Sequence, residues 1–478
     1  MPFALSRAAR HAPRFFALML MLPLLAIQAQ AQNLPREVDA ALARAKVPRD
    51  AVTILVADAD GIRPPRLAWR TQVQVNPASI MKLVTTYAAL DLLGPAFTWN
   101  TPVYVDGPVR NGVLEGNLYI KGQGDPKLVL ERLWLLLRRV QALGVQSIQG
   151  DIVLDRSAFQ VGETDPSAFD GEGLRPYNAA PDALLINFKS VVMTFVPDKE
   201  SQTAQVSYEP RLAGVSMQAT VPLTGGECGD WRATLAAGFS EPGRFSFAGS
   251  YPAACGEKTW PVAYADPGSY AARAVAGLWG EMGGRLRGQV RDGLVPTGLK
   301  PAFEISSPPL AEVIRDINKY SNNVMAQQLF LTLGLRLKQR GSFEAARSTV
   351  RQWWNDRIGT GEGQPELDNG SGLSRDGRIT AAALAKMLQA AWRSPVMPEL
   401  VSSLPASGVD GTLRKRALRS GAAAHLKTGS LRDAAGVAGI VHGASGRRYV
   451  LVAIANHANA GAARQAFDEL VDWTAMDD

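Results

Sequence analysis

The spacing of apolar positions predicts a regular start to the chain. An amphipathic stretch over 33–47 predicts a short helix, and the apolar run over 51–57 predicts a strand. A second strand is expected at 67–70. A helix follows that begins near Ser79 and stops at Gly94, a residue suited to a helix end. Strand, turn, strand and helix in this order are the opening of an α/β or α+β domain.

The middle of the chain, from about 100 to 270, has a different pattern. Short β-like runs alternate there with Gly, Pro and Asp, and one helix is predicted over 126–142. The β-like runs lie at 113–121, 152–154, 191–196 and 204–208. The most regular strand-and-turn texture lies between 188 and 263. We therefore predict a small β module nested inside a larger insertion.

Helical periodicity returns after Ser306-Ser307-Pro308-Pro309, which is typical of a linker that re-enters the first domain. Helices are predicted at 310–319, 324–340, 343–358, 380–392 and 397–403. Strands are predicted at 424–426, 435–442 and 448–456, and an amphipathic helix at 460–475 closes the chain. The turn Ala444-Ser445-Gly446 makes the last two strands a hairpin.

The first 31 residues have the pattern of a secretory signal peptide. Arg7, Arg10 and Arg14 precede an apolar run over 15–27, which is short for a membrane-spanning helix, and a small-x-small cleavage site ends at Ala31. Without these three arginines the formal charge falls from +7 to +4, and no basic run remains, so nucleic-acid binding is not expected. No transmembrane segment is expected after cleavage, because no second long apolar run follows.

The chain contains two cysteines, Cys228 and Cys255, which enclose a short loop. In an oxidising compartment such a pair predicts one structural disulfide. Two thiols without a nearby His make a poor metal site, so no metal is expected.

Ser79 is the only Ser in the chain with a Lys three positions later, Lys82. A spacing of three places both side chains on one face of a helix, within hydrogen-bond reach. A serine hydroxyl becomes a nucleophile when a neighbouring base takes its proton, and lysine is such a base when burial or a nearby cation lowers its pKa. This spacing arises by chance about once in a chain of this length. The alternative is therefore an ordinary helix start with a solvated lysine.

Two later motifs support the nucleophile. Ser321-Asn322-Asn323 is an S-x-N tripeptide in a predicted helix–helix connection, and Lys427-Thr428-Gly429 lies on a predicted strand. A glycine in a strand often marks the close approach of another backbone or a ligand. S-x-x-K, S-x-N and K-T-G in this order are the motif set of penicillin-binding proteins and class A β-lactamases.

On these motifs the chain resembles the class C low-molecular-mass penicillin-binding proteins, which are D-alanyl-D-alanine carboxypeptidases/endopeptidases. The resemblance covers nearly the whole mature chain, and the separation of 242 positions from Ser79 to Ser321 matches the two domains that this family inserts there. Stretches 122–126, 368–375 and 404–413 also look like this family.

The resemblance implies an α/β (α+β) serine penicillin-recognising transpeptidase/β-lactamase-like domain with a large, mainly β, nested two-domain insertion. The expected boundaries are a signal peptide at 1–31, the D,D-peptidase domain at 32–97 and 305–478, inserted domain II at 98–187 and 264–304, and nested β-rich domain III at 188–263.

Acyl transfer suggests a role for each motif residue. Ser79 is expected to attack the carbonyl between two D-alanines with Lys82 as proton acceptor, and Ser321 to relay a proton to the leaving amine. Asn323 is expected to hold Lys82 and a substrate amide. No metal or organic cofactor is required. Tyr320-Ser321-Asn322 also fits the Y-x-N pattern of class C β-lactamases, but the register of Ser321 and Asn323 matches the family better.

The K-T-G strand is expected to bind the substrate. The cation of Lys427, with Thr428, suits the terminal carboxylate, and Gly429 precedes Ser430, whose backbone N–H the resemblance places with that of Ser79 in an oxyanion hole.

Substrate specificity is expected to involve the insertion. In this family an Asp of the first inserted domain contacts the free amine of the substrate's diamino-acid side chain, and the local pattern selects Asp155. The alternative is a surface Asp that ends a strand. Phe159 is the candidate for packing against the same substrate side chain.

The expected function is that of a periplasmic serine D,D-peptidase. Its partners are peptidoglycan stem peptides and cross-links, with β-lactams as covalent inhibitors, and a homo-oligomer is left open. Two alternatives remain: an enzyme that hydrolyses β-lactams, and a non-catalytic cell-wall sensor or scaffold. Intact motifs count against the sensor, and the long insertion counts against the β-lactamase.

Overall fold

The computed structural model describes residues 33–162, 164–361, 363–416, 418–421 and 423–477. The predicted signal peptide, residues 1–31, lies outside the described residues. Within the described ranges, no helix is both long enough and apolar enough to cross a membrane.

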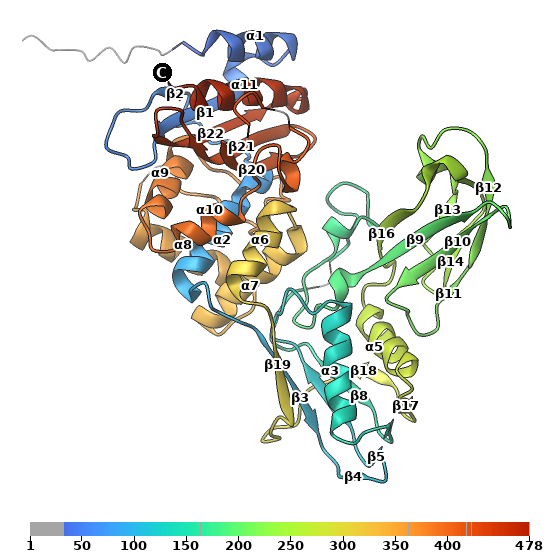
Figure 1. Cartoon of the computed structure of the whole chain (residues 1–478). Helices are drawn as coiled ribbons and strands as arrows, with labels where there is room; N and C mark the ends of the chain where they lie inside the picture. Colours follow the sequence, from blue (N-terminus) through green and yellow to red (C-terminus); the bar gives the residue numbers. More distant parts are fainter. Residues whose placement is uncertain (1–32, 163, 362, 417, 422, 478) are drawn as a thin grey trace, which may run out of the picture. The chain divides into compact units, whose positions relative to one another are not determined.

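A five-stranded antiparallel sheet brings together the early and late parts of the chain (Figure 1). Its strands, in spatial order, are β2 (Leu67–Trp69), β1 (Val52–Asp58), β22 (Arg448–Asn456), β21 (Ala434–His442) and β20 (Ala424–Ser430). In β22, Val450 and Val452 belong to one hydrophobic core, while Leu451 and Ala453 belong to another. Because alternate side chains point to opposite faces, a strand covered on both sides has an unbroken apolar sequence.

Helices cover both faces of this sheet. One core is formed with α1 (Arg36–Arg44) and α11 (Arg464–Ala475), which follows the short 3₁₀ turn η7 (Ala460–Ala463). The other is formed with α2 (Lys82–Leu93), α6 (Leu310–Lys319), α7 (Asn323–Lys338), α8 (Phe343–Arg357), α9 (Ala381–Trp392) and α10 (Met397–Ser403). The first nine residues of helix α2 are all buried. The helix therefore has no polar face, and its sequence lacks the alternation of apolar and polar positions that is typical of a surface helix.

The insertion leaves and returns through two neighbouring strands. These are β3 (Asn100–Val105) and β19 (Phe303–Ser306), which pair antiparallel with Asn100 opposite Ser306. They belong to a five-stranded sheet with the order β18 (Val290–Asp292), β8 (Ile152–Asp155), β6 (Leu118–Lys121), β3 and β19. A smaller sheet has the order β17 (Arg285–Leu286), β7 (Ser147–Ile148), β5 (Val113–Leu114) and β4 (Val109–Arg110). Helices α3 (Leu130–Ala142) and α5 (Tyr270–Glu281) contribute to the insertion's core.

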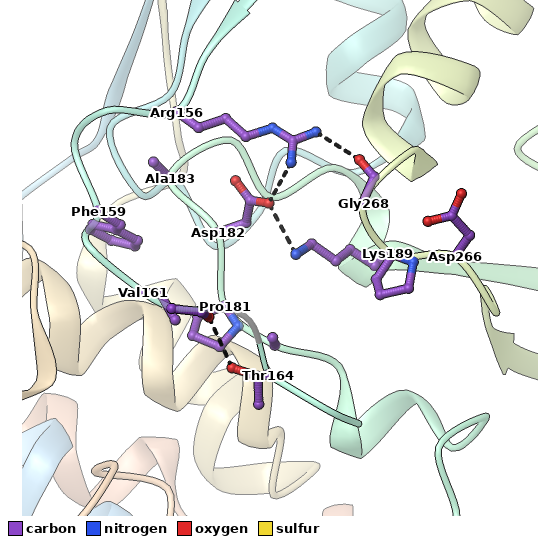
Figure 2. Close-up of a pocket in the computed structure, with 13 residues that line it drawn as sticks. Arg156, Phe159, Val161, Thr164, Pro181, Asp182, Ala183, Lys189, Asp266 and Gly268 are labelled. Atoms are coloured by element: carbon purple, nitrogen blue, oxygen red, sulfur yellow. Dashed lines mark hydrogen bonds and ion pairs between the residues drawn. The ribbon is translucent and has the colours of Figure 1, made fainter. Parts of the chain in front are cut away.

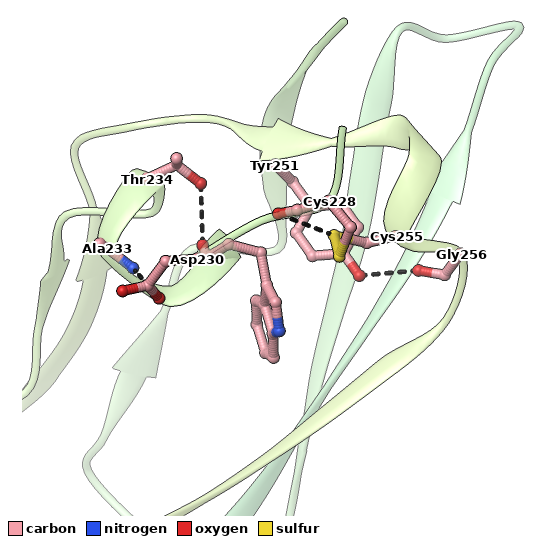
Figure 3. Close-up of a disulfide and its surroundings, with 8 residues drawn as sticks. Cys228, Asp230, Ala233, Thr234, Tyr251, Cys255 and Gly256 are labelled. Atoms are coloured by element: carbon pink, nitrogen blue, oxygen red, sulfur yellow. Dashed lines mark hydrogen bonds between the residues drawn. A yellow bond between two sulfur atoms is a disulfide. The ribbon is translucent and has the colours of Figure 1, made fainter. Parts of the chain in front are cut away.

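Residues 188–263 form the β-rich part of the insertion. One sheet has the order β15 (Tyr251–Pro252), β12 (Thr220–Thr224), β10 (Thr203–Glu209), β9 (Ser190–Asp198) and β16 (Lys258–Ala263). A second has the order β11 (Ser216–Met217), β14 (Arg244–Phe247) and β13 (Ala237–Gly238). The ring of Phe195 packs edge-to-face on Phe247 and stacks on Tyr251. Cys228 and Cys255 form a disulfide beside the short helix α4 (Trp231–Thr234), as Figure 3 shows.

The insertion is fastened to α7 through Asp182. The side chain of Gln328 on α7 accepts a hydrogen bond from the Asp182 backbone N–H and donates one to its carbonyl, both at 2.8 Å. The Asp182 carboxylate lies between the side chains of Lys189 and Arg156, at 3.0 and 3.4 Å (Figure 2). Because this carboxylate is buried, removal of either cation would leave its charge less compensated and would destabilise the contact.

The mixed helix and sheet fold expected from the sequence is confirmed, and most elements lie within a few residues of their predicted bounds. Three details were wrong. Helix α5 was not predicted, although its buried residues recur at helical spacing, because Gly277 and Gly280 dilute the signal. Helix α3 begins at Leu130 and not at 126, and the run 113–121 is two strands. We propose the domain boundaries as predicted: the insertion begins just before β3 and ends within β19, and the β-rich part begins just before β9 and ends with β16.

The disulfide predicts a measurable loss of stability when it is removed. Cys228 and Cys255 are 27 residues apart, and cross-linking a loop of that length lowers the entropy of the unfolded chain by an amount worth about 3–4 kcal/mol. We expect the Cys228→Ser/Cys255→Ser variant to lose about that much unfolding free energy in urea denaturation. Wild-type protein under reducing conditions should behave like the variant. Equal stability of the oxidised wild type and the variant would contradict the prediction.

Candidate active site

Ser79 lies in a short 3₁₀ turn that leads into α2. The turn η2 spans Ala78–Met81, and the α-helix begins at Lys82, three residues later than the sequence suggested. The turn is held by Asn456, whose side chain accepts from the Asn76 N–H at 2.7 Å and donates to its carbonyl at 2.9 Å. Because both bonds are made to one backbone unit, the chain enters the turn at a fixed position.

Lys82 is completely buried and has three polar neighbours. Its Nζ lies 3.0 Å from Ser79 Oγ, 2.6 Å from Asn323 Oδ1 and 2.6 Å from the Ser371 carbonyl. Burial, and then the charge of nearby Lys427, holds the pKa of Lys82 well below its usual value. A neutral amine has two N–H groups and one lone pair. The two carbonyl-type oxygens take the N–H groups, which leaves the lone pair for the Ser79 hydroxyl.

Ser321 and Lys427 form a second hydroxyl–amine pair. Lys427 on β20 is also fully buried, and its Nζ lies 2.9 Å from Ser321 Oγ and 2.8 Å from the Thr428 carbonyl. Burial lowers the pKa of Lys427 to about 7. Ser321 has a backbone φ of +56°, a left-handed conformation that costs a non-glycine residue about 1–3 kcal/mol. The turn between α6 and α7 therefore holds this serine in a conformation that the surrounding structure must impose.

Two glycines allow the backbone segments to approach the Ser79 turn. A Cβ atom at Gly429 would lie 2.6 Å from the Pro77 carbonyl oxygen, and one at Gly372 would lie 1.9 Å from that of Ala78. Neither position has room for a side chain. The glycine of the K-T-G motif is thus required because β20 passes directly against the nucleophile turn.

A cavity of about 510 Å³ opens in front of both serines. It is lined by Ser79, Phe169, Asp170, Tyr177, Tyr320, Ser321, Asn323, Leu373, Arg375, Ser430, Leu431 and Arg432. Lys82 and Lys427 lie behind this surface and reach it through the two hydroxyls. Neither at this cavity nor elsewhere in the described residues do three or more His, Cys, Asp and Glu side chains form a group that could hold a metal ion. The arrangement suits acyl transfer, in which a serine attacks and a second hydroxyl moves a proton.

A family of known proteins matches almost the whole chain. The model of the D-Ala-D-Ala carboxypeptidase 3 (S13) family matches residues 34–476. The chain belongs to this family. It is a serine-type D-alanyl-D-alanine carboxypeptidase, a peptidase of peptidoglycan.

Individual relatives are distant but cover most of the chain. A D-alanyl-D-alanine carboxypeptidase from Actinomadura sp. is 27% identical over 83% of this chain and 76% of its own length. The crystal structure of penicillin binding protein 4 from Haemophilus influenzae superposes with a TM-score of 0.72 at 21% identity, covering 91% of this chain and 99% of that one. A penicillin G-acylated predatory endopeptidase from Bdellovibrio bacteriovorus, in complex with an immunity protein, gives 0.50 at 16% identity, covering 88% and 91%.

The structure brings the three motifs of the peptidase together, in the register of Ser321 and Asn323. Asn323 contacts Lys82 through Oδ1, but its Nδ2 donates to the Tyr177 carbonyl at 3.2 Å. Its amide is therefore engaged with the insertion in place of the expected substrate amide. Tyr320 is 70% exposed at the cavity rim, while Asn322 caps α7 by accepting from the Met325 N–H.

The K-T-G strand differs in part from its expected role. Lys427 has no exposed surface and faces Ser321, so it does not present its charge to the open cavity. The Thr428 hydroxyl lies 2.8 Å from that of Thr412, and Thr428 is not among the lining residues. Ser430 lines the cavity beside Ser79. The exposed cations on the cavity wall are instead Arg375 and Arg432.

Asp155 and Phe159 are not among the residues that line this cavity. The Asp155 carboxylate is 1% exposed and accepts hydrogen bonds from Ser157 and from the Val295 N–H, so it fastens the end of β8. Phe159 packs against Ala183 and lines a different cavity of about 480 Å³, the one shown in Figure 2. Asp155 thus fixes a strand end inside the insertion, and Phe159 packs between the insertion and Leu331 of α7.

Asp170 is the carboxylate of the insertion that does line the cavity with Ser79. It accepts hydrogen bonds from the Tyr177 hydroxyl at 2.9 Å and from the Asn178 side chain at 2.8 Å. Burial acts to raise its pKa, but these bonds, with one from the Glu172 N–H, hold the pKa below its usual value. Asp170 lies in an irregular loop, where no periodicity or motif spacing marks it in the sequence.

The burial of Lys427 predicts how stability depends on pH. Its pKa falls from 10.5 to about 7 on folding, so between these values the unfolded state binds one more proton. The unfolding free energy that Lys427 contributes therefore rises by about 1.4 kcal/mol per pH unit from about pH 7 to about pH 10, and is flat below. We expect Lys427→Met to remove this slope in urea denaturation at several pH values. Parallel pH profiles for the variant and the wild type would contradict the prediction.

Proposed function

We propose that this peptidase removes the terminal D-alanine from peptidoglycan stem peptides and cleaves D,D cross-links between stems, in the periplasm, through a Ser79 acyl-enzyme. The observation that carries the proposal is the environment of Lys82. A fully buried lysine with two carbonyl-type acceptors and one serine hydroxyl can act as a general base towards that serine alone. An ordinary solvated lysine at a helix start has no such neighbours.

In the acylation step, neutral Lys82 takes the proton of Ser79 while Ser79 Oγ bonds to the carbonyl carbon between the two D-alanines. The backbone N–H groups of Ser79 and Ser430 are the proposed donors to the oxyanion. As the C–N bond breaks, Ser321 gives its proton to the leaving amine and takes one from the Lys427 ammonium. Lys82 is then protonated and Lys427 is neutral.

In the deacylation step, the two lysines exchange roles. A water molecule bonds to the acyl carbon, and its proton passes through Ser321 to neutral Lys427. Ser79 leaves and regains its proton from the Lys82 ammonium, so both lysines return to their starting states. A pKa near 7 suits Lys427 to this work, because both its forms are accessible at neutral pH. Its charge in the starting state also favours neutral Lys82.

Two features of the cavity wall support a peptide substrate with a free carboxylate and a free amine. Arg375 and Arg432 are exposed residues of this wall, and a guanidinium group binds a carboxylate well. Arg375 also donates to the Phe169 carbonyl at 3.0 Å, which holds its side chain at the wall. Asp170 is the carboxylate on the insertion side, where we propose that it meets the side-chain amine of the diamino acid. This replaces Asp155 in that role.

β-Lactams resemble D-Ala-D-Ala, and a related peptidase from Bdellovibrio bacteriovorus has been seen acylated by penicillin G. We expect benzylpenicillin to form a stable adduct of one penicillin mass on the Ser79 peptide of the wild-type protein, and none with Ser79→Ala, by mass spectrometry. Lys82→Met should slow the reaction by about 100-fold or more, because general base catalysis is lost. Intact drug without an adduct would favour a sensor or scaffold. Hydrolysed drug without an adduct would favour a β-lactamase.

The two aspartates of the insertion make a matched pair for testing specificity. We expect Asp170→Asn to raise KM by about 10-fold for stem peptides with a free side-chain amine, because one charge-assisted hydrogen bond is lost. The same peptides with an acetylated amine should be unaffected. Asp155→Asn serves as the control, since it alters a buried contact away from the cavity. If both variants discriminate between the two peptides as the wild type does, Asp170 has no part in amine recognition.

A further inference from the structure

Lys319 is a nearly buried cation two residues before Ser321. Its side chain is 7% exposed, and its Nζ donates to the Leu404 carbonyl at 2.8 Å and to Asp410 Oδ2 at 2.6 Å. The other carboxylate oxygen of Asp410 accepts from the Ala406 N–H at 2.9 Å. The catalytic steps proposed above do not use this ion pair, although it adjoins the turn that carries Ser321.

Both acceptors of Lys319 lie in one stretch of chain, residues 404–413, which we call the bridging segment. Its other side pairs with β20, the strand of Lys427. The Leu426 N–H donates to the Pro405 carbonyl at 3.0 Å, and the Ser407 N–H donates to the Ala424 carbonyl at 2.9 Å. Thr412 reaches the same strand one residue beyond Lys427, through its 2.8 Å contact with Thr428.

The bridging segment also lies directly against the backbone before Ser321. A Cβ atom at Gly411, which has a φ of +55°, would lie 2.5 Å from the Lys319 carbonyl oxygen. The last turn of α6 adds further bonds just before the segment, from Arg315 to the Ser402 carbonyl at 3.1 Å and from Asn318 to Ser403 Oγ at 2.8 Å. Among these contacts the Lys319–Asp410 bond is the one between opposite charges.

We propose that the Lys319–Asp410 ion pair is a positioning device that holds Ser321 Oγ against Lys427 Nζ for proton transfer. Ser321 and Lys427 are 106 residues apart in sequence, and their hydroxyl–amine distance of 2.9 Å joins a helix–helix turn to a strand. The left-handed backbone of Ser321 relaxes unless its flanks are fixed. Lys319 fixes the backbone just before Ser321. Because the bridging segment is bonded to β20, this contact holds that backbone at a set position relative to Lys427. The inference rests on the proposed role of Ser321.

The ion pair acts on the rate of chemistry and not on the affinity for substrate. Lys319 and Asp410 are not among the residues that line the cavity. Loss of the pair lets the Ser321 hydroxyl move away from Lys427 Nζ. A displacement of about 1 Å in a reacting group costs about 100-fold in rate. Ground-state binding uses the cavity wall, to which neither residue of the pair contributes.

The test separates the acylation rate constant from the binding constant for a fluorescent penicillin, by stopped flow. We expect Lys319→Met and Asp410→Asn each to lower the acylation rate constant by about 10- to 100-fold, with the binding constant within about 2-fold of wild type. Asp410→Asn retains an acceptor for the Ala406 N–H and removes only the charge towards Lys319. The double variant should be no slower than the slower single variant, because both changes break one interaction. Lys319→Arg should recover part of the rate.

Asp468→Asn is the matched control. Asp468 forms an ion pair with Arg416 at 3.0 Å. The Asp468 side chain is 32% exposed, close to the 33% of Asp410. Asp468 lies on α11, whereas Asp410 pairs with a residue next to the Ser321 turn. The Asp468→Asn variant should acylate at the wild-type rate. Thermal unfolding of all variants separates a loss of fold from a loss of rate, and Asp410→Asn provides the answer if Lys319→Met does not fold.

Each outcome tests either the proposed function or the positioning role of the ion pair. A wild-type protein that is never acylated on Ser79 overturns the proposed function itself. A wild type that is acylated, with Lys319→Met and Asp410→Asn equally fast, overturns the positioning role alone. A binding constant that weakens while the rate constant stays unchanged also overturns it, since the pair would then shape the cavity. Additive losses in the double variant would show two independent effects and no ion pair at work.

Discussion

The burial of Lys82 is the constraint on which the site depends. Burial disfavours the charged form of a lysine, so an amine with no exposed surface is held neutral, and its two N–H groups and its lone pair then each need a partner. Lys82 meets this condition with three oxygens, from the nucleophile turn, from the start of α7 and from the Ser371 loop. One side chain therefore locks together three segments that are far apart in sequence, and the same interaction that organises them makes the amine a base.

Close backbone packing is the second requirement. The turn of Ser79 lies between β20 on one side and the Gly372 loop on the other, at distances that exclude any Cβ atom at Gly429 or Gly372. Because Gly429 has no side chain, β20 can lie directly against the Ser79 turn, and this brings Lys427 and Ser430 near the nucleophile. This packing also buries the Lys427 side chain behind Ser321, and burial lowers the pKa of Lys427 to about 7.

The insertion has a core of its own and meets the peptidase domain at small apolar contacts on α7. It departs and returns through the paired strands β3 and β19, and small clusters join it to Leu331 and Val324 of α7. Its contribution to the cavity is a single irregular loop with Phe169, Asp170 and Tyr177. The insertion therefore lines the cavity through this loop, and it contacts the catalytic groups where the Tyr177 carbonyl accepts from Asn323.

The sequence by itself predicted most of the elements and the residues proposed for the chemistry. The inner strands β21 and β22 are largely apolar because both sheet faces are covered, and Ser79, Lys82, Ser321, Asn323 and Lys427 stand in motifs whose spacing reflects local geometry. Only the tertiary structure decided which carboxylate faces the cavity, that Lys427 is buried against Ser321, and that Lys319 and Asp410 meet across 91 residues. These contacts join segments through loops without periodicity. A local pattern such as that of Asp155 cannot report them, because burial and long-range distance arise only when the chain has folded.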